Sequence, residues 1–220
     1  MIVHEHLEQG SEEWLRARLG CATASMASSV ITPTGKLSAS RIGYARKLAR
    51  QCSIADTFPF EGNKYTEWGH QHEPAARAYF EQETGIKVSE VGFCTREDKI
   101  IGCSPDGLIK GEDGEWIAGL EIKAPQIDQH GEYLIAGELP AAYRPQVHWS
   151  LAATGLKKWN FVSYHPQPEN SPRELRQLIV EVHADEFTER VREAQDAFLG
   201  TFREQFDLVM EKLYVGGGAR

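Results

Sequence analysis

Long hydrophobic runs are missing from this 220-residue sequence. No stretch approaches the roughly eighteen uninterrupted apolar residues that a membrane-spanning helix needs. The N-terminus lacks the basic segment followed by an apolar segment that marks a secretory signal, and no internal repeat or low-complexity segment is visible. We therefore expect a soluble protein that works in the cytoplasm and has no membrane partner.

Cysteine is scarce. The chain has four cysteines, at scattered positions and without a Cys-x-x-Cys pair: Cys21, Cys52, Cys94 and Cys103. This spacing favours small buried thiols in a reducing compartment over a zinc site or a disulfide framework. His70 and His72 are two residues apart in a helical pattern, so their side chains face different directions and are expected to be structural or exposed rather than a metal pair.

An excess of positive charge is also missing, because the formal net charge is −8. The segment 181–212 carries nine acidic and four basic residues and so contributes five of these eight excess negative charges. The rest of the chain is nearly balanced. Distribution matters more than the sum for binding a polyanion, and the net charge neither supports nor excludes a nucleic-acid partner.

The chain is long enough for one substantial core, and we expect a single domain over residues 1–215 with a disordered tail over 216–220. Hydrophobic periodicity and capping residues predict six helices and a loop over 53–64. The helices are expected over 8–19, 23–30, about 38–50, 67–84, 145–155 and 187–213, the last with a possible break at Gly200. Its apolar stripe is typical of core or subunit packing.

Short β-rich runs predict strands over 88–93, 99–103, 116–122, 159–164 and 175–182. The first three are bounded by turn residues and are expected to form antiparallel hairpins. The order of helices and strands predicts an α/β (α+β) fold in which a mixed central sheet is flanked by helices on both sides.

The most informative residues are Asp106, which stands in the turn sequence Pro-Asp-Gly, and Glu121 and Lys123 in a strand that follows. Residues two apart in a strand leave the same face, so Glu121 and Lys123 share one surface. If Asp106 lies at the turn before the preceding strand, a hairpin places a second carboxylate beside Glu121. Two carboxylates, a main-chain carbonyl and waters suit Mg²⁺, and a nearby lysine can orient or deprotonate water.

Each of these pieces also has a structural interpretation. Pro-Asp-Gly is a common turn, and Glu-x-Lys on a strand is often an exposed ion pair of small energetic value. The apolar residues around Glu121 and Lys123 indicate a well-packed strand that pushes both charges to one side. The coincidence favours a Mg²⁺-dependent site for phosphodiester hydrolysis.

The sequence also carries a family resemblance. Pro105-Asp106 followed by Glu121-Ile122-Lys123 resembles the PD-(D/E)xK nuclease motif. The wider chain resembles the lambda-type phage exonucleases, also called YqaJ-like viral recombinases, in four further blocks spread over about residues 8–165. These blocks are Glu8-Gln9-Gly10 with Trp14; Arg18-Leu19-Gly20 with Thr23-Ala24-Ser25; Trp68-Gly69 with Glu73 and Ala76-Arg77; and Tyr143 with Gln146.

The resemblance implies a restriction-endonuclease-like fold and a role for each matching residue. Asp106, Glu121 and the carbonyl of Ile122 would bind the catalytic Mg²⁺, and Glu73 would help to hold a second ion, with Mn²⁺ able to substitute. Lys123 and Gln146 would place the attacking water. The pocket for a 5′-phosphate would be formed by Arg18, Ser25 and Ser104.

Some of these residues have alternatives. Ser25 could cap a helix after Thr23, Arg18 could pair with Glu12 or Glu13, and Glu73 could sit at a helix break before Pro74. His148 stands where the family often has a second glutamine, and it either shares the site or packs beneath it. Lys36 and Arg41 are weaker candidates for phosphate contacts.

The function that the resemblance implies is an ATP-independent 5′→3′ exonuclease that degrades one strand of linear double-stranded DNA from a 5′-phosphorylated end to mononucleotides. It also implies a homotrimer, a single-strand annealing protein as partner, and a phage or prophage gene expressed in the cytoplasm of a bacterial host. The alternatives are a structure-specific or restriction-type endonuclease, a catalytically inactive DNA-end-binding module, and a structural oligomer held by the terminal helix.

Overall fold

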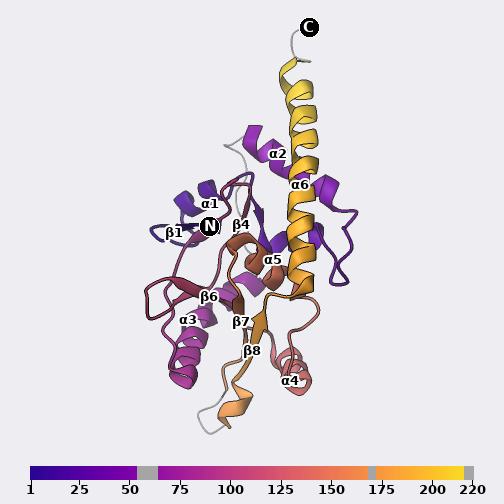
Figure 1. The fold of residues 1–220 in the computed structure, drawn as a ribbon. Helices are drawn as coiled ribbons and strands as arrows, with labels where there is room; N and C mark the ends of the chain where they lie inside the picture. The colour runs from indigo at the N-terminus through magenta and orange to yellow at the C-terminus, as the bar shows by residue number, and fades with distance from the viewer. Residues whose placement is uncertain (54–63, 168–171, 216–220) are drawn as a thin grey trace.

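The computed structural model describes residues 1–53, 64–167 and 172–215. Two four-stranded mixed sheets form its centre, with helices around them (Figure 1). The interior of the loop predicted over 53–64 lies outside the described residues, while its two ends belong to helices. The tail predicted over 216–220 lies outside them altogether.

The first sheet collects short strands that are far apart in the sequence. Its order is β1 (Ile2–His4), β3 (Phe93–Thr95), β4 (Ile101–Cys103) and β2 (Ala22–Thr23). The pairs β1–β3 and β3–β4 are antiparallel, and β4–β2 is parallel. Every residue of β2, β3 and β4 is buried, so this sheet forms part of the core rather than a surface.

The second sheet carries the residues of most interest. Its order is β5 (Gly107–Lys110), β6 (Trp116–Lys123), β7 (Lys158–Tyr164) and β8 (Gln177–His183). The pairs β5–β6 and β7–β8 are antiparallel and β6–β7 is parallel. Gly119 has no side chain because the ring of Trp159 fills that space: a Cβ there would lie 2.4 Å from it.

Two helices occupy the crossover that a parallel strand pair requires. They are α4 (Ile127–Ala136) and α5 (Arg144–Thr154), both of which end at a glycine in the left-handed conformation. Helix α5 is buried along most of its length and packs against β3, β4, β7 and α6, so it joins the two sheets. Any residue on α5 is therefore rigidly placed relative to the second sheet.

The remaining helices cover the outside. They are α1 (Glu12–Ala17), the 3₁₀ helix η1 (Ala24–Ser29), α2 (Arg41–Ser53), α3 (Lys64–Thr84), the 3₁₀ turn η2 (Arg173–Leu175), α6 (Glu186–Met210) and its π-helical end η3 (Glu211–Val215). The second sheet has α3 on one side and α4 on the other (Figure 1). Ser11 caps α1, and Asp185 with Thr188 forms a capping box at the start of α6.

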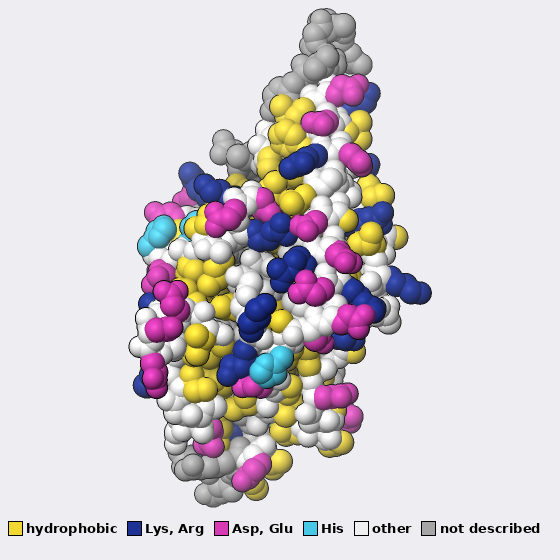
Figure 2. All heavy atoms as spheres, viewed as in Figure 1, with side chains coloured by type: hydrophobic (Ala, Val, Ile, Leu, Met, Phe, Trp, Pro, Cys, Tyr) yellow, Lys and Arg dark blue, Asp and Glu magenta, His cyan; other side chains and the backbone are white. Residues whose placement is uncertain are grey.

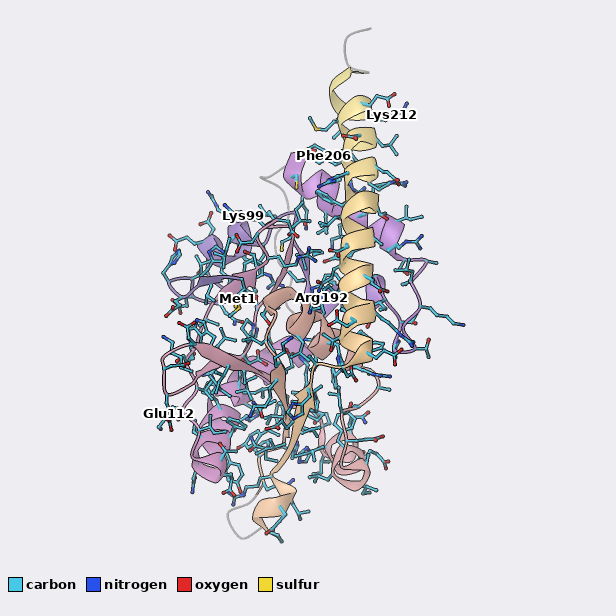
Figure 3. The ribbon with its side chains drawn as sticks, in the orientation of Figure 1. Met1, Lys99, Glu112, Arg192, Phe206 and Lys212 are labelled. Carbon is cyan, nitrogen blue, oxygen red and sulfur yellow. The ribbon has the colours of Figure 1, made fainter. Side chains whose placement is uncertain are left out.

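Helix α6 crosses and packs against α2 and projects beyond the sheets, with Phe206 and Lys212 near its far end (Figure 3). The ring of Phe198, which is fully buried, lies 5.6 Å from that of Tyr44 on α2. Acidic and basic side chains alternate on the visible face of α6 (Figure 2), in agreement with ion pairs such as Arg190–Glu186. The acidic residues counted in the sequence are thus partly neutralised locally.

Several sequence predictions need correction. The helix predicted over 23–30 is present, but as the 3₁₀ helix η1 over Ala24–Ser29, and Thr23 belongs instead to β2, which pairs with β4. A strand over 88–93 is wrong: β3 begins at Phe93, and Ser89 makes only an isolated bridge to Leu108. The main chain of Leu7 packs against Gly92, where a Cβ would lie 2.0 Å from the carbonyl oxygen of Leu7.

The elements that were not predicted include the strands β1, β2 and β5, the helix α4 and the 3₁₀ turn η2. Helix α6 runs through Gly200 without a break. Within the described part of the chain, no helix is long and apolar enough to cross a membrane.

Candidate active site

The β5–β6 hairpin brings Asp106 beside Glu121, as expected from the turn sequence. Asp106 directly precedes β5, and its amide donates to the carbonyl of Leu120 at 3.1 Å. Its carboxylate Oδ2 accepts a hydrogen bond from the amide of Ile122 at 2.5 Å. The tip of the hairpin, near Glu112 (Figure 3), lies at the opposite end of the two strands. Asp106 is therefore fixed to strand β6 at two successive peptide groups, once through its amide and once through its carboxylate.

Glu121 and Lys123 lie on one face of β6, and Ile122 between them points into the core cluster beneath α3. The side chain of Glu121 is 3% exposed and that of Lys123 is 27% exposed. The ammonium Nζ of Lys123 contacts Oε1 of Glu121 directly. The buried carboxylate is thus shielded from solvent, while the lysine reaches toward the cleft.

Helix α5 adds a second donor to the same oxygen. Nε2 of Gln146 donates to Oε1 of Glu121 at 2.5 Å. Tyr143, at the start of the helix, places its ring 5.5 Å from Nζ of Lys123. Glu121 therefore accepts from a cation and an amide that come from two different elements.

The electrostatics of this cluster are those of acids crowded together away from water. Burial raises the pKa of Asp106 to about 7, with a further contribution from Glu73, against the opposing effect of Lys123. Burial also raises the pKa of Glu121 to about 7, and the charge of Asp106 adds to the shift. Burial acts to lower the pKa of Lys123, but Glu121 and Asp106 outweigh it and the net shift is upward.

Glu73 approaches the cluster from α3, which continues through Pro74 without a break. Its Oε1 accepts from Nη2 of Arg77 at 2.6 Å, and burial raises its pKa. The charges of Glu121 and Glu90 act in the same direction. The alternative that Glu73 marks the end of a helix is wrong.

The donor set fits a hard divalent cation. Among the described residues, no group of three or more His, Cys, Asp or Glu side chains is arranged to hold a metal. A cation beside Asp106 and Glu121 would therefore need the carbonyl of Ile122 and water to complete its coordination, and this mixture is what Mg²⁺ accepts. Its charge would also offset the burial and, to a lesser extent, the repulsion between carboxylates that raise both pKa values.

A cleft of about 770 Å³ opens above these residues. Its lining includes all nine residues that the sequence singles out for the site: Arg18, Ser25, Glu73, Ser104, Asp106, Glu121, Ile122, Lys123 and Gln146. They come from the residue that ends α1, and from η1, α3, the β4–β5 connection, β6 and α5. The tertiary structure thus collects side chains that the sequence scatters over more than half of its length.

The part of the cleft near α1 is suited to an anion. The guanidinium of Arg18 lies 4.0 Å from the ring centre of Trp14, whose Nε1 donates to the carbonyl of Gly92 at 2.9 Å. Glu12 pairs with Arg16 rather than Arg18. Within the described chain, the buried Oγ of Ser104 has no hydrogen-bond partner.

Ser25 contributes an exposed hydroxyl to the same region, and its Oγ lies 3.2 Å from Oγ1 of Thr23. Thr23, not Ser25, occupies the capping position of η1. Two hydroxyls and a half-buried cation therefore face the cleft.

Other candidates lie away from the cluster. His148 packs beneath the site, where its Nδ1 lies 2.7 Å from Oγ1 of Thr188. Lys36 and Arg41 do not line the cleft.

Cys21, Cys94 and Cys103 are buried and free, as predicted, whereas Cys52 is exposed. His70 is exposed in the cleft, and the ring of His72 lies 4.1 Å from that of Trp68.

Sequence reasoning assigned no role to Gln9 or Arg77, although both lie in the blocks that carry the resemblance. Gln9 donates to the carbonyls of Pro105 and Val91, and Nε of Arg77 donates to the carbonyl of Asp106. A buried polar side chain that hydrogen-bonds a distant main-chain group leaves no periodic signal in the sequence.

The comparisons with known proteins agree with this geometry. Residues 13–157 match the YqaJ-like viral recombinase domain. The crystal structure of an alkaline exonuclease from Laribacter hongkongensis has 30% sequence identity and a TM-score of 0.76, over 92% of this chain and 97% of that one. Its complex with dAMP gives the same values. The restriction-endonuclease-like fold is thereby confirmed.

A phage-related exonuclease from Haemophilus somnus 129PT shares the fold at 16% identity, with a TM-score of 0.60 over 88% of this chain and 96% of that one. No curated protein matches the sequence. The domain match alone spans well over half of the 220 residues. On the matched domain and the 30% identical exonuclease together, the chain belongs to the YqaJ-like viral recombinase family.

Proposed function

We propose that this protein is a Mg²⁺-dependent, ATP-independent 5′→3′ exonuclease that digests one strand of linear double-stranded DNA from 5′-phosphorylated ends. The products would be mononucleotides and a 3′ single strand ready for annealing. The observation that carries the proposal is the convergence of Asp106, Glu121 and Lys123 on the floor of a cleft that also contains Arg18. Family membership and likeness to an alkaline exonuclease support a nuclease acting on DNA.

Asp106, Glu121 and the carbonyl of Ile122 would hold the Mg²⁺, with Mn²⁺ as a possible substitute. When bound, the ion supplies Lewis-acid polarisation of a phosphate oxygen. Glu73 lies at the side of the cluster and would help to hold a second ion. Because Arg77 already pairs with Glu73, that second site would be the weaker of the two.

Lys123 and Gln146 would place the attacking water. Both donate to Glu121, so their nitrogen atoms lie together at the edge of the buried carboxylate. The raised pKa of Lys123 keeps it a cation, which can hold a water oxygen by donating a hydrogen bond and can offset phosphate charge. Glu121, which accepts a hydrogen bond from Lys123, fixes the orientation of the lysine side chain.

Arg18, Ser25 and Ser104 would form the pocket for the 5′-phosphate. Arg18 has no carboxylate partner among the described residues, and burial lowers its pKa, so an anion would be a favourable partner for it. The related alkaline exonuclease has been crystallised with dAMP. We propose that a nucleoside monophosphate is likewise a product bound in this cleft.

Assembly and biological context belong to the same proposal. We infer a homotrimer that works with a single-strand annealing protein in the cytoplasm of a bacterial host, in keeping with a viral recombinase family. Light scattering of the purified protein tests the trimer: a mass of about 74 kDa, three times 24.7 kDa, is expected, and a monomer would contradict it.

Digestion of end-labelled linear duplex, with and without Mg²⁺, tests the activity. Labelled mononucleotides should appear from a 5′-phosphorylated end only when Mg²⁺ is present, and more slowly from a 5′-hydroxyl end. Covalently closed circular DNA should remain intact. Rapid linearisation of the circle would favour an endonuclease, and binding of DNA ends without release of nucleotides would favour an inactive end-binding module. No DNA binding at all would favour a structural oligomer.

A further inference from the structure

The turn that carries Asp106 is held on its outer side by two polar side chains from distant parts of the chain. Nε2 of Gln9 donates to the carbonyl of Pro105 at 2.8 Å. Nε of Arg77 donates to the carbonyl of Asp106 at 3.1 Å. These two carbonyls belong to the peptide groups on either side of the Asp106 Cα. The orientation of both peptide planes is therefore fixed from outside the hairpin.

Each of the two side chains is itself anchored. Nε2 of Gln9 also donates to the carbonyl of Val91 at 3.1 Å. The guanidinium of Arg77, which is 12% exposed, pairs with Glu73 at 2.6 Å and with Glu90 at 2.8 Å. Both side chains thus make more than one bond, and neither can turn away without breaking another contact.

The inner side of the turn is tied to β6 by the amide of Asp106 and by the bond from the amide of Ile122 to its carboxylate. Gly107 packs against Val88, where a Cβ would lie 2.1 Å from a methyl carbon. With the two outer donors, the main chain around Asp106 is held on both sides. Such rigidity matters because Asp106 is repelled by Glu73 and Glu121, and an unrestrained turn could relax by swinging its carboxylate away.

We propose that Gln9 and Arg77 are positioning residues: they clamp the peptide groups flanking Asp106 and so hold its carboxylate in the place where it binds the divalent cation. The inference rests on the proposed Mg²⁺ site. Neither residue has to touch DNA or the ion. Groups that orient a metal ligand through hydrogen bonds change metal affinity or activity by about 10- to 100-fold when they are lost.

The test compares Gln9→Leu and Arg77→Gln with variants that remove the same chemistry elsewhere. Gln177→Leu is the match for Gln9, because Nε2 of Gln177 donates to the carbonyl of Ala76 at 2.9 Å, away from the turn. Arg96→Gln is the match for Arg77, because Arg96 pairs with Asp98 at 3.0 Å and Asp196 at 2.8 Å. Glu90→Gln removes one of the two anchors of Arg77 and leaves the hydrogen bond from Arg77 to Asp106, so its effect should be smaller than that of Arg77→Gln.

Two quantities are measured on the full-length protein: the affinity for Mn²⁺ without DNA, by calorimetry, and the Mg²⁺ concentration for half-maximal hydrolysis. Gln9→Leu should weaken both by about 10- to 100-fold, with KM for DNA ends nearly unchanged. Arg77→Gln should weaken both in the same direction but by a smaller factor, because it also releases the carboxylate of Glu73 from its ion pair. Gln177→Leu and Arg96→Gln should alter melting temperature at most. Arg77→Lys, which can keep only part of the geometry, should fall between wild type and Arg77→Gln.

The two levels of the proposal fail in different ways. If the wild-type protein neither binds Mn²⁺ nor hydrolyses DNA with Mg²⁺, the proposed function is wrong. If the wild type does both, and Gln9→Leu and Arg77→Gln keep the metal affinity of their matched controls, the clamp is overturned while the function stands. An effect on KM for DNA alone would also overturn it.

Discussion

Replacing Asp106 by asparagine should stop DNA hydrolysis and at the same time stabilise the metal-free protein above pH 7. The asparagine side chain keeps an oxygen that can accept from the amide of Ile122, as the carboxylate does now. It removes the charge that is repelled by Glu73 and Glu121. The variant thus separates the cost of the buried charge from the loss of a hydrogen bond.

Proton linkage decides in which direction the free energy of unfolding changes with pH. Burial raises the pKa of Asp106 from 3.8 to about 7, so between these values the folded protein keeps a proton that the unfolded chain releases. The free energy of unfolding of the metal-free wild type therefore falls as the pH rises through this window, and it stays low above pH 7. Asp106→Asn lacks this titration, so its free energy of unfolding falls less over the window, and the fall that remains comes from the raised pKa values of Glu121 and Glu73.

An upper limit can be set on the stability that Asp106→Asn gains. Each unit of pKa difference corresponds to about 1.4 kcal/mol, so the shift of Asp106 from 3.8 to about 7 sets an upper limit of about 4 kcal/mol. Because the side chain borders an open cleft, solvent screening reduces this value, and we expect about 2 kcal/mol. For a chain of this size, that gain raises the melting temperature by roughly 4–8 °C.

Differential scanning calorimetry with EDTA at pH 5 and pH 8 measures the effect. The gain should be largest at pH 8 and smaller at pH 5, because pH 5 lies inside the window between 3.8 and about 7 and only part of the gain is present there, and Mg²⁺ at pH 8 should stabilise the wild type but not Asp106→Asn. Asp207→Asn, at an exposed position of α6, makes the same chemical change away from the site and serves as control. A variant that melts at or below the wild type at pH 8, or equally far above it at both pH values, would refute the buried repulsion.

Three further predictions follow from the site and the core. Lys123→Ala should lower hydrolysis by at least about 100-fold while binding to duplex DNA in Ca²⁺ stays nearly intact, and undiminished turnover would remove the lysine from the mechanism. Arg18→Ala should narrow the preference for 5′-phosphate over 5′-hydroxyl ends, compared as kcat/KM, and an equal loss on both ends would count against a phosphate pocket. Phe198→Ala, at a fully buried side chain between α6 and α2, should lower the free energy of unfolding in urea by about 3–5 kcal/mol; a change below about 1 kcal/mol would contradict the packing described for these two helices.

The sequence by itself determined the local frame of the site. Alternation over 116–122 placed Glu121 and Lys123 on one face of a strand, and the turn sequence placed Asp106 at the base of the hairpin. Apolar periodicity likewise predicted α3, α5 and α6. These features succeed because the period of a strand or helix, and the backbone preference of a turn, are set by residues only a few positions apart.

Elements whose existence depends on distant partners were missed. Strand β1 is three residues long and pairs with β3, about ninety residues later in the chain. Strand β5 is a short apolar run that periodicity cannot separate from a helix or a loop. The helix predicted over 23–30 begins later than predicted, because Ala22 and Thr23 form a strand that pairs in parallel with β4.

Only the tertiary structure decided which side chains share the cleft. Arg18, Glu73, Ser104 and Gln146 belong to separate elements and meet because α5 joins the two sheets and α3 covers one of them. It also decided that Gln9 and Arg77 reach the carbonyls beside Asp106. A hydrogen bond across more than twenty residues is fixed by packing between elements, and no pattern within either segment records it.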